Sequence, residues 1–293
     1  MNDTNDAARS ITPREKLDFG LDGDIPQYWF GGDPFKTRLF DAMSTIFPEG
    51  ERFFISCVRD FRDQVTDPQL RQDIKDFMRQ EGQHGVVHSQ YNERLKAQGI
   101  DVDALEAFEH RMLFDFERKY FSAEQTLAET AAAEHMTAIM AHGFFARKEV
   151  LESADPRMRA LYAWHAMEEV EHKAVAFDVM QKVAKVGYLR RVIALVLVTT
   201  GFNIHCLHTT NYMLKVDGFS GLQRFKLITK GLWWLFKPGG LYTSMARHYL
   251  QYFKPGFHPW DEGQMHSYQL WLDTFNRTGD PVLAGEVLHA AAP

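Results

Sequence analysis

Apolar residues recur three and four positions apart along much of the chain, the spacing of one buried helix face, and no alternating strand pattern competes with it. The first such stretch covers residues 35–65, with a kink or restart predicted at Pro48. Asp67-Pro68 then pairs an N-cap residue with a proline at the first helical position. This signal predicts a second helix over residues 67–97.

The same cap-and-proline signal at Asp155-Pro156 opens a helix that is predicted to reach residue 186. Residues 104–150 are too long for one ordinary helix, and a break is expected near residues 121–122. Four long helices with short connections are typical of a four-helix bundle. The sequence therefore predicts an all-α bundle over residues 35–187.

The two ends of the chain have a different character. Residues 1–34 contain three prolines and a Gly-Gly pair, and we expect an irregular N-terminal segment there. Residues 188–293 are predicted to form a C-terminal helical appendage. It contains the apolar run 192–198, which is too short to span a bilayer as a simple helix.

Two of the predicted helices carry a glutamate three residues before a histidine. These pairs are Glu81 with His84 and Glu169 with His172. Residues three apart lie on one helix face, so each carboxylate and imidazole can point inward together. The other two helices can each add a single glutamate. This is the recipe for a dinuclear metal site inside a bundle, in which four carboxylates balance two divalent ions and the imidazoles stay neutral.

The single glutamates have competitors. Glu51, which would fall in the first turn of a helix restarting after Pro48, is the candidate in the first helix, and Glu49 is its rival. Glu134 is the candidate in the third helix, where Glu129 competes with it. The small residues before Glu134 permit close helix approach. His135 should point elsewhere, towards the surface or behind the ligands.

In the fourth helix Glu168, Glu169 and Glu171 all precede His172. Glu169 is preferred because His165 then joins the same helix face, where it can act as a seventh ligand. Glu171 should face away from the site.

Other polar residues can assist the ligands. His88 lies one turn beyond His84 and is either an additional ligand or a hydrogen-bonded core histidine. Metal-bound histidines usually donate their second nitrogen to a carboxylate or amide. By analogy with related bundles, we predict that Glu168 orients His84 and that Gln80 orients His172.

These motifs resemble those of a known family. Glu81-x-x-His84-x-x-x-His88 together with the segment 164–173 and Ala176-Phe177-Asp178 resembles the bacterial "predicted metal-dependent hydrolase" family. In ligand order the chain is also similar to ferritin-like di-iron carboxylate oxygenases. The spacing of His165, Glu169 and His172 resembles p-aminobenzoate N-oxygenases, which carry an extra histidine ligand. The resemblance implies a ferritin-like bundle that binds two metal ions.

Three functions compete. The ligand set favours an O2-activating di-iron oxygenase or oxidase with iron as the metal, manganese or zinc as substitutes, and an external electron donor. The alternative is a hydrolase that uses metal-activated hydroxide. Metal storage is a third. A hydrophobic or aromatic small-molecule substrate is expected. Six aromatic residues either line a pocket for it or belong to the ordinary core: Phe53, Phe54, Phe77, Phe144, Phe145 and Trp164.

The composition of the chain limits which partners and which cellular location are expected. The formal net charge of −6 gives no broad basic field, so nucleic acid is not expected to bind. The two cysteines and the polar N-terminus without an apolar signal-peptide core favour a cytoplasmic protein. A homodimer is one candidate assembly. Trp233, Trp234, Phe236 and Lys237 either pack on the bundle or form a peripheral membrane contact.

Overall fold

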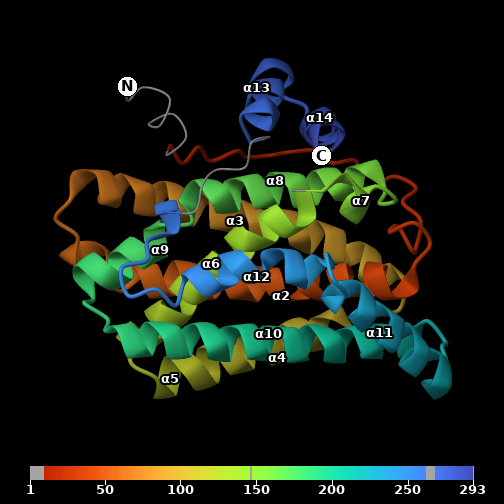
Figure 1. Cartoon of the computed structure of the whole chain (residues 1–293), viewed down its shortest axis with the longest axis horizontal. Helices are drawn as coiled ribbons and strands as arrows, with labels where there is room; N and C mark the ends of the chain where they lie inside the picture. The colour runs from red at the N-terminus through yellow and green to blue at the C-terminus, as the bar shows by residue number, and fades with distance from the viewer. Residues whose placement is uncertain (1–9, 146, 262–267, 293) are drawn as a thin grey trace.

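The protein is described by a computed structural model that covers residues 10–145, 147–261 and 268–292 (Figure 1). The described residues are predominantly helical, as predicted. Within them the β structure amounts to an isolated antiparallel bridge between Phe30 and Ala154. Residues 1–9 of the predicted irregular segment lie outside the described residues.

Most of the chain is divided among helices of very different lengths. In chain order they are α2 (Pro34–Arg59), α3 (Pro68–Ala97), α4 (Val102–His110), a π-helical turn (Arg111–Glu117), α5 (Arg118–Tyr120), α6 (Ala123–Phe145), α7 (Lys148–Leu151), α8 (Pro156–His172), α9 (Val175–Asp178), a second π-helical turn (Val179–Val183), α10 (Tyr188–Val216), α11 (Gly221–Phe236), α12 (Leu241–Gln251), α13 (Tyr268–Thr278) and α14 (Pro281–Ala291).

Two predicted helix starts lie where the sequence placed them. The side chains of Asp67 and Asp155 accept hydrogen bonds from the backbone N–H groups of Gln69 and Arg157. The following prolines occupy the first helical turn, where no donor is needed. After α3 the chain turns at Gly99 with φ of +86°, a conformation that glycine adopts without strain.

Other helix boundaries differ from the prediction. The first helix ends at Arg59 rather than at residue 65. The break expected near residues 121–122 is confirmed, because α5 ends at Tyr120, the backbone is extended at Phe121 and α6 begins at Ala123. The fourth helix was predicted to reach residue 186, which is wrong. It ends at His172, and α9 and a π-helical turn follow a short turn at Lys173.

Of the kink or restart predicted at Pro48, the restart is wrong, because α2 continues through this residue and Glu51 lies inside the helix. Proline removes the N–H that would bond the carbonyl four residues earlier, which is that of Ser44. The side-chain amide of Asn92 on α3 donates to this carbonyl at 3.1 Å. A neighbouring helix thus supplies the missing donor, and the helix does not break.

Four helices pack in a ring, in the order α2, α3, α8 and α6, each against its two neighbours. The C-terminal helices cover the outside of this ring. Helix α10 lies along α2 and α6, α12 packs on α6, and α14 packs on α8 (Figure 1). Helix α11 approaches α2 closely at Gly231, where an added methyl group would overlap the Phe35 ring.

Candidate metal centre

The polar residues of the ring interior come from all four of its helices. Glu51 lies on α2, Glu81 and His84 on α3, Glu134 on α6, and His165, Glu169 and His172 on α8. All seven are buried, with at most 4% of the residue exposed. The structure therefore brings together every residue that the sequence predicted as a ligand.

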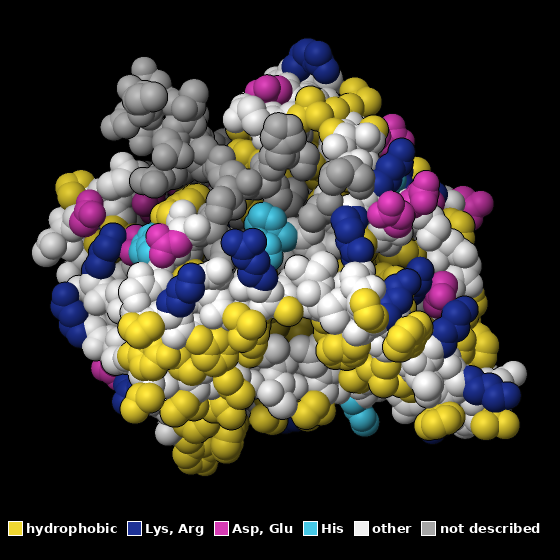
Figure 2. Space-filling model, in the orientation of Figure 1, with side chains coloured by type: hydrophobic (Ala, Val, Ile, Leu, Met, Phe, Trp, Pro, Cys, Tyr) yellow, Lys and Arg dark blue, Asp and Glu magenta, His cyan; other side chains and the backbone are white. Residues whose placement is uncertain are grey.

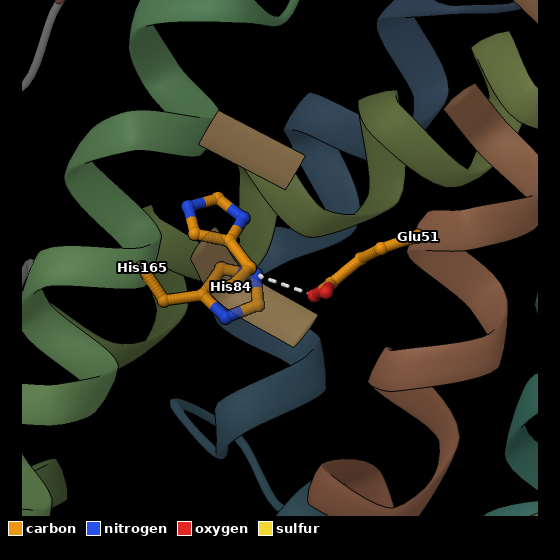
Figure 3. A group of neighbouring side chains, drawn as sticks. All are labelled: Glu51, His84 and His165. Carbon is orange, nitrogen blue, oxygen red and sulfur yellow. Dashed lines mark ion pairs between the residues drawn. The ribbon is translucent and has the colours of Figure 1, made fainter. Parts of the chain in front are cut away.

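One half of the cluster joins Glu51, His84 and His165 (Figure 3). One donor atom from each of the three lies within 4.8 Å of the others. Nε2 of His165 is 3.9 Å from Oε1 of Glu51, and the two imidazole rings stack with centroids 4.1 Å apart. Gly85 on α3 permits this approach, because a Cβ there would be 3.2 Å from Oε2 of Glu51.

The other half is centred on His172. Its Nε2 lies 3.0 Å from Oε1 of Glu81, 3.2 Å from Oε2 of Glu134 and 3.4 Å from Oε2 of Glu169. The second oxygen of Glu169 is 3.1 Å from Nε2 of His165, in the first half. Glu169 therefore reaches both halves with one carboxylate, and a hydroxyl bond from Thr137 fixes its orientation.

Eight oxygen and nitrogen atoms of this cluster make no hydrogen bond within the described part of the chain. They are both carboxylate oxygens of Glu51, Glu81 and Glu134, Nδ1 of His84 and Nε2 of His172. Buried polar atoms without partners are rare and call for an explanation such as a bound ion. Carboxylate oxygen and imidazole nitrogen together suit iron, manganese or zinc, so this donor set fits a metal.

The charges in the cluster are mutually dependent. Burial, reinforced by neighbouring glutamates, raises the pKa of Glu51 well above its usual range, and burial raises the pKa of Glu81 to about 8 and that of Glu134 to about 7. Burial also favours protonation of Glu169, but His172 and His165 hold its pKa well below the usual range. Burial, with His165 beside it, lowers the pKa of His84 well below its usual value. Divalent cations would displace the protons that these carboxyl groups retain.

Two hydrogen bonds join the residue pairs that the sequence had paired. Nε2 of His84 lies 3.1 Å from Oε2 of Glu168, and Nδ1 of His172 lies 2.9 Å from Oε1 of Gln80. Because a carboxylate and an amide oxygen can only accept, each imidazole carries its proton on this outer nitrogen. Since the pKa of His84 is lowered, its inner nitrogen presents a lone pair to the cluster. Burial opposes protonation of His172, but Glu134 and Glu169 raise its pKa well above the usual value, so its inner nitrogen retains a proton that a divalent cation would displace.

His88 supports His165 from outside the cluster. Its Nε2 is 2.8 Å from Nδ1 of His165, and its Nδ1 is 2.9 Å from the Ser44 hydroxyl. The Ser44 hydroxyl donates in turn to Oδ1 of Asn92. Both nitrogens of His88 are therefore engaged, which favours the hydrogen-bonded alternative for this residue. A proton on Nδ1 of His165 leaves its Nε2 free to face Glu51 and Glu169.

Arg14, a buried residue that the sequence did not indicate, lies next to Glu168 and Glu171, beside the residues that orient His84 and His172. Arg14 bonds Glu168 at 3.0 Å and Glu171 at 2.7 Å. Glu171 also accepts from the side-chain amide of Gln80 at 2.7 Å and from the hydroxyl of Tyr268 at 2.6 Å. Arg14 lies in a segment with no helical pattern, so the sequence offers no periodic signal for it. Glu171 faces away from the cluster as expected, but it is buried rather than solvated.

The rival residues point elsewhere. Glu49 pairs with Arg52 at 2.5 Å and with His110 at 2.9 Å, and Glu129 bonds Gln125 at 2.8 Å. His135 packs its ring against Tyr252 on the far side of α6. It is buried, so the alternative of a surface position is wrong for this histidine.

A small apolar pocket adjoins the cluster at Glu169 and His165. Its other walls are Phe47, Thr137, Met140, Ala141, Phe144, Tyr162 and Ala166. Of the six aromatic residues expected around the site, Phe144 lines this pocket. Trp164 and Phe77 instead pack against the rings of His84 and His172.

Fold and site together define an all-α protein with buried histidine and glutamate groups that could hold metal ions. Residues 12–263 match the model of a family described as "predicted metal-dependent hydrolase", and the chain belongs to that family. The match begins just before Arg14 and includes every residue of the cluster. No curated protein and no solved structure gave a match.

Proposed function

We propose that this cluster binds two divalent metal ions. The observation that carries the proposal is the convergence of eight buried oxygen and nitrogen atoms, none hydrogen-bonded in the described chain, from four helices. Glu51, His84 and His165 would hold one ion, and Glu134 and His172 the other. Glu81 and Glu169 would lie between the two. This arrangement follows the ferritin-like ligand recipe.

The proposed reaction is hydrolysis, which the family description favours. Two ions in such a site lower the pKa of a bound water and polarise a carbonyl or phosphoryl group. The chain's own contribution is to keep the ligand set ordered and to supply four carboxylates, whose charge two divalent ions would balance. Glu168 and Gln80 hold protons on the outer nitrogens of His84 and His172, so both rings bind as neutral imidazoles.

The pocket beside the cluster bears on the substrate. Phe47, Met140 and Phe144 form an apolar wall, while Glu169 and His165 supply the polar end. The pocket has a free volume of about 20 Å³, room for roughly one water molecule, so it is the apolar chemistry of its lining that bears on the substrate class. We therefore propose a hydrophobic or aromatic small molecule as the substrate class.

A second candidate is oxidation by a di-iron centre, which would require an electron donor. The observation in its favour is the donor set itself, with four buried carboxylates and three imidazoles and no cysteine among the grouped ligands of the described chain. Reduced iron held by such hard oxygen and imidazole ligands reacts with dioxygen. The apolar pocket would exclude water from that chemistry.

Metal binding is tested first. Chelator-treated protein should take up close to two equivalents of zinc, manganese or ferrous iron by elemental analysis. Glu81→Ala and Glu134→Ala should lower that stoichiometry, while Glu286→Ala, at an exposed position on α14, should not. Uptake that is absent, or unchanged in the two cluster variants, would overturn the proposed centre.

The reaction is tested on the loaded protein. Ester and phosphoester turnover by the zinc or manganese form, lost in Glu81→Ala, supports hydrolysis. Oxygen consumption by the anaerobically prepared ferrous form, with a ferric absorbance band appearing afterwards, supports oxidation instead. Full metal loading without either reactivity would contradict both and favour metal storage.

A further inference from the structure

A large apolar surface lies on the opposite side of the molecule from α13 and α14. In Figure 2 apolar side chains gather over its lower edge, where Figure 1 places α4, α5, α10 and α11. Contiguous apolar patches of this kind on soluble domains mark contact sites. We call the exposed side chains of these helices the apolar face.

Helix α10 contributes the longest part. Leu189, Ile193, Leu197 and Ile204 follow one another at helical spacing and are each more than half exposed. Between residues 191 and 215 the helix has no charged side chain. Among the described helices, α10 is long and apolar enough to cross a membrane by length and composition. The apolar run 192–198 is therefore only part of a longer apolar helix.

The opposite face of α10 packs against the rest of the protein. Thr209 and Thr210 are fully buried, and Thr210 bonds backbone carbonyls of Cys206 and Arg38. Arg191 donates to the carbonyls of Tyr252 and Lys254. A spanning helix would have to give up these contacts, whereas a helix lying in the plane of a surface keeps them.

Helix α11 adds an aromatic stripe bordered by lysines. Phe225 and Trp233 are 68% and 66% exposed, and Phe236 continues their line. Lys226 and Lys230 stand exposed beside these rings. Trp234, which the sequence had grouped with Trp233, instead packs against Phe30 and Lys36.

A third row of apolar side chains comes from α4, α5 and the π-helical turn between them. Phe108, Met112, Phe116 and Tyr120 recur every four residues and are all exposed. The ring of Phe108 stacks on His205 of α10 at 5.4 Å, so this row lies beside α10.

The charged residues around the apolar face indicate which kind of partner would cover it. Residues 188–260, which include α10 and α11, contain nine lysines and arginines and one acidic residue, Asp217, although the whole chain carries −6. Residues 102–120, at the other edge of the face, carry five acidic and three basic residues, so the cationic part of the face lies on α10 and α11. A two-fold dimer through the same face would bring like-charged lysines together, because an isologous interface meets its own copy. Exposed aromatic rings bordered by lysines match an anionic lipid surface.

We propose that the apolar face docks the protein in-plane on an anionic phospholipid bilayer. The proposal is independent of the reaction at the metal centre. Flotation of the full chain with vesicles of phosphatidylcholine plus phosphatidylglycerol should recover bound protein. Vesicles of phosphatidylcholine alone should bind it more weakly, and salt should reduce the difference.

Variants test the surface directly. The double variant F225S/W233S should bind at least about tenfold more weakly because two exposed aromatic anchors are lost. The double variant K226E/K230E should lose roughly tenfold at low salt. Leu283→Ser, at an exposed apolar position on α14, should bind like the wild type. Metal content and far-UV circular dichroism should be unchanged in all three.

Three results would overturn the proposal. The first is wild-type protein that floats with neither vesicle, and the second is variants that bind like the wild type. The third is a wild-type dimer in sedimentation that F225S/W233S converts to monomer without any vesicle binding, which would assign the face to a second copy of the chain.

Discussion

Glu168 and Gln80 each stand one residue before a glutamate of the candidate metal centre. Successive helix residues point about 100° apart, so these side chains face a neighbouring helix rather than the ring interior. Each bonds the histidine of that neighbouring helix, at 3.1 Å and 2.9 Å. One-residue steps in the motif thus separate ligands from the groups that orient them.

Replacing Glu168 by alanine should weaken metal binding about 10- to 100-fold, because Nε2 of His84 loses its acceptor and the ring its fixed orientation. Metal titration of chelator-treated protein by calorimetry measures this. Glu286→Ala serves as the control for loss of an exposed helical carboxylate. Wild-type affinity in Glu168→Ala would refute the positioning role.

At the scale of elements, the irregular N-terminal segment is fastened between α8 and α13. Arg14 bonds Glu168 and Glu171 of α8, and its guanidinium lies over the ring of Trp271 on α13 at 5.1 Å. The segment thus closes the side of the ring where the histidine supports lie. A segment without helical periodicity has a structural role here.

Arg14→Leu should destabilise the protein by about 3–5 kcal/mol, because it leaves two buried carboxylates without their cation. Urea denaturation with and without metal measures the change. Arg79→Leu is the matched control, since its ion pair with Glu15 is solvent-exposed and should contribute little. Equal effects of the two substitutions would contradict this account.

Replacing either of two mid-helix glycines by alanine should change the stability, in opposite directions. Gly231→Ala on α11 should cost roughly 1–3 kcal/mol, because the new methyl would lie 2.1 Å from the Phe35 ring of α2. Gly201→Ala on α10 meets nothing within 4 Å and should stabilise by roughly 0.5–1 kcal/mol. Thermal denaturation of both variants tests whether α11 is packed as described; a stabilising Gly231→Ala would show that it is not.

At the scale of the whole molecule, metal-free protein should change its pH response near neutrality. Burial raises the pKa of Glu81 to about 8 and those of Glu134 and Glu168 to about 7, so their stability contribution is lost as the pH rises through these values. Burial lowers the pKa of His135 to about 3. A histidine with a lowered pKa makes the stability rise with pH, but only up to the pKa of histidine in the unfolded chain, about 6.5.

We therefore expect the Tm of metal-free protein to fall between about pH 6.5 and 8, with Glu81 contributing about 1–2 kcal/mol of the loss. Glu81→Gln cannot ionise and should flatten the profile. Added metal should raise the Tm more at the upper end of this window, because fewer protons compete for the carboxylates. A metal-free Tm that rises across the window would be the contrary result.

Local signals set several features without help from the fold. Asp67-Pro68 and Asp155-Pro156 mark true helix starts because capping depends on neighbouring backbone groups alone. The spacing of Glu81 with His84 and of Glu169 with His172 places each pair on one face for the same reason. The class of fold and the set of converging residues could therefore be predicted from the sequence.

Tertiary contacts decided the rest, because they join residues that no local pattern connects. Pro48 would break an isolated helix, yet α2 continues since Asn92 on another helix supplies the donor. Arg14 becomes buried only because α8 and α13 surround it. Likewise, both faces of α10 are apolar in sequence, and packing against α2 and α6 determines which one stays exposed.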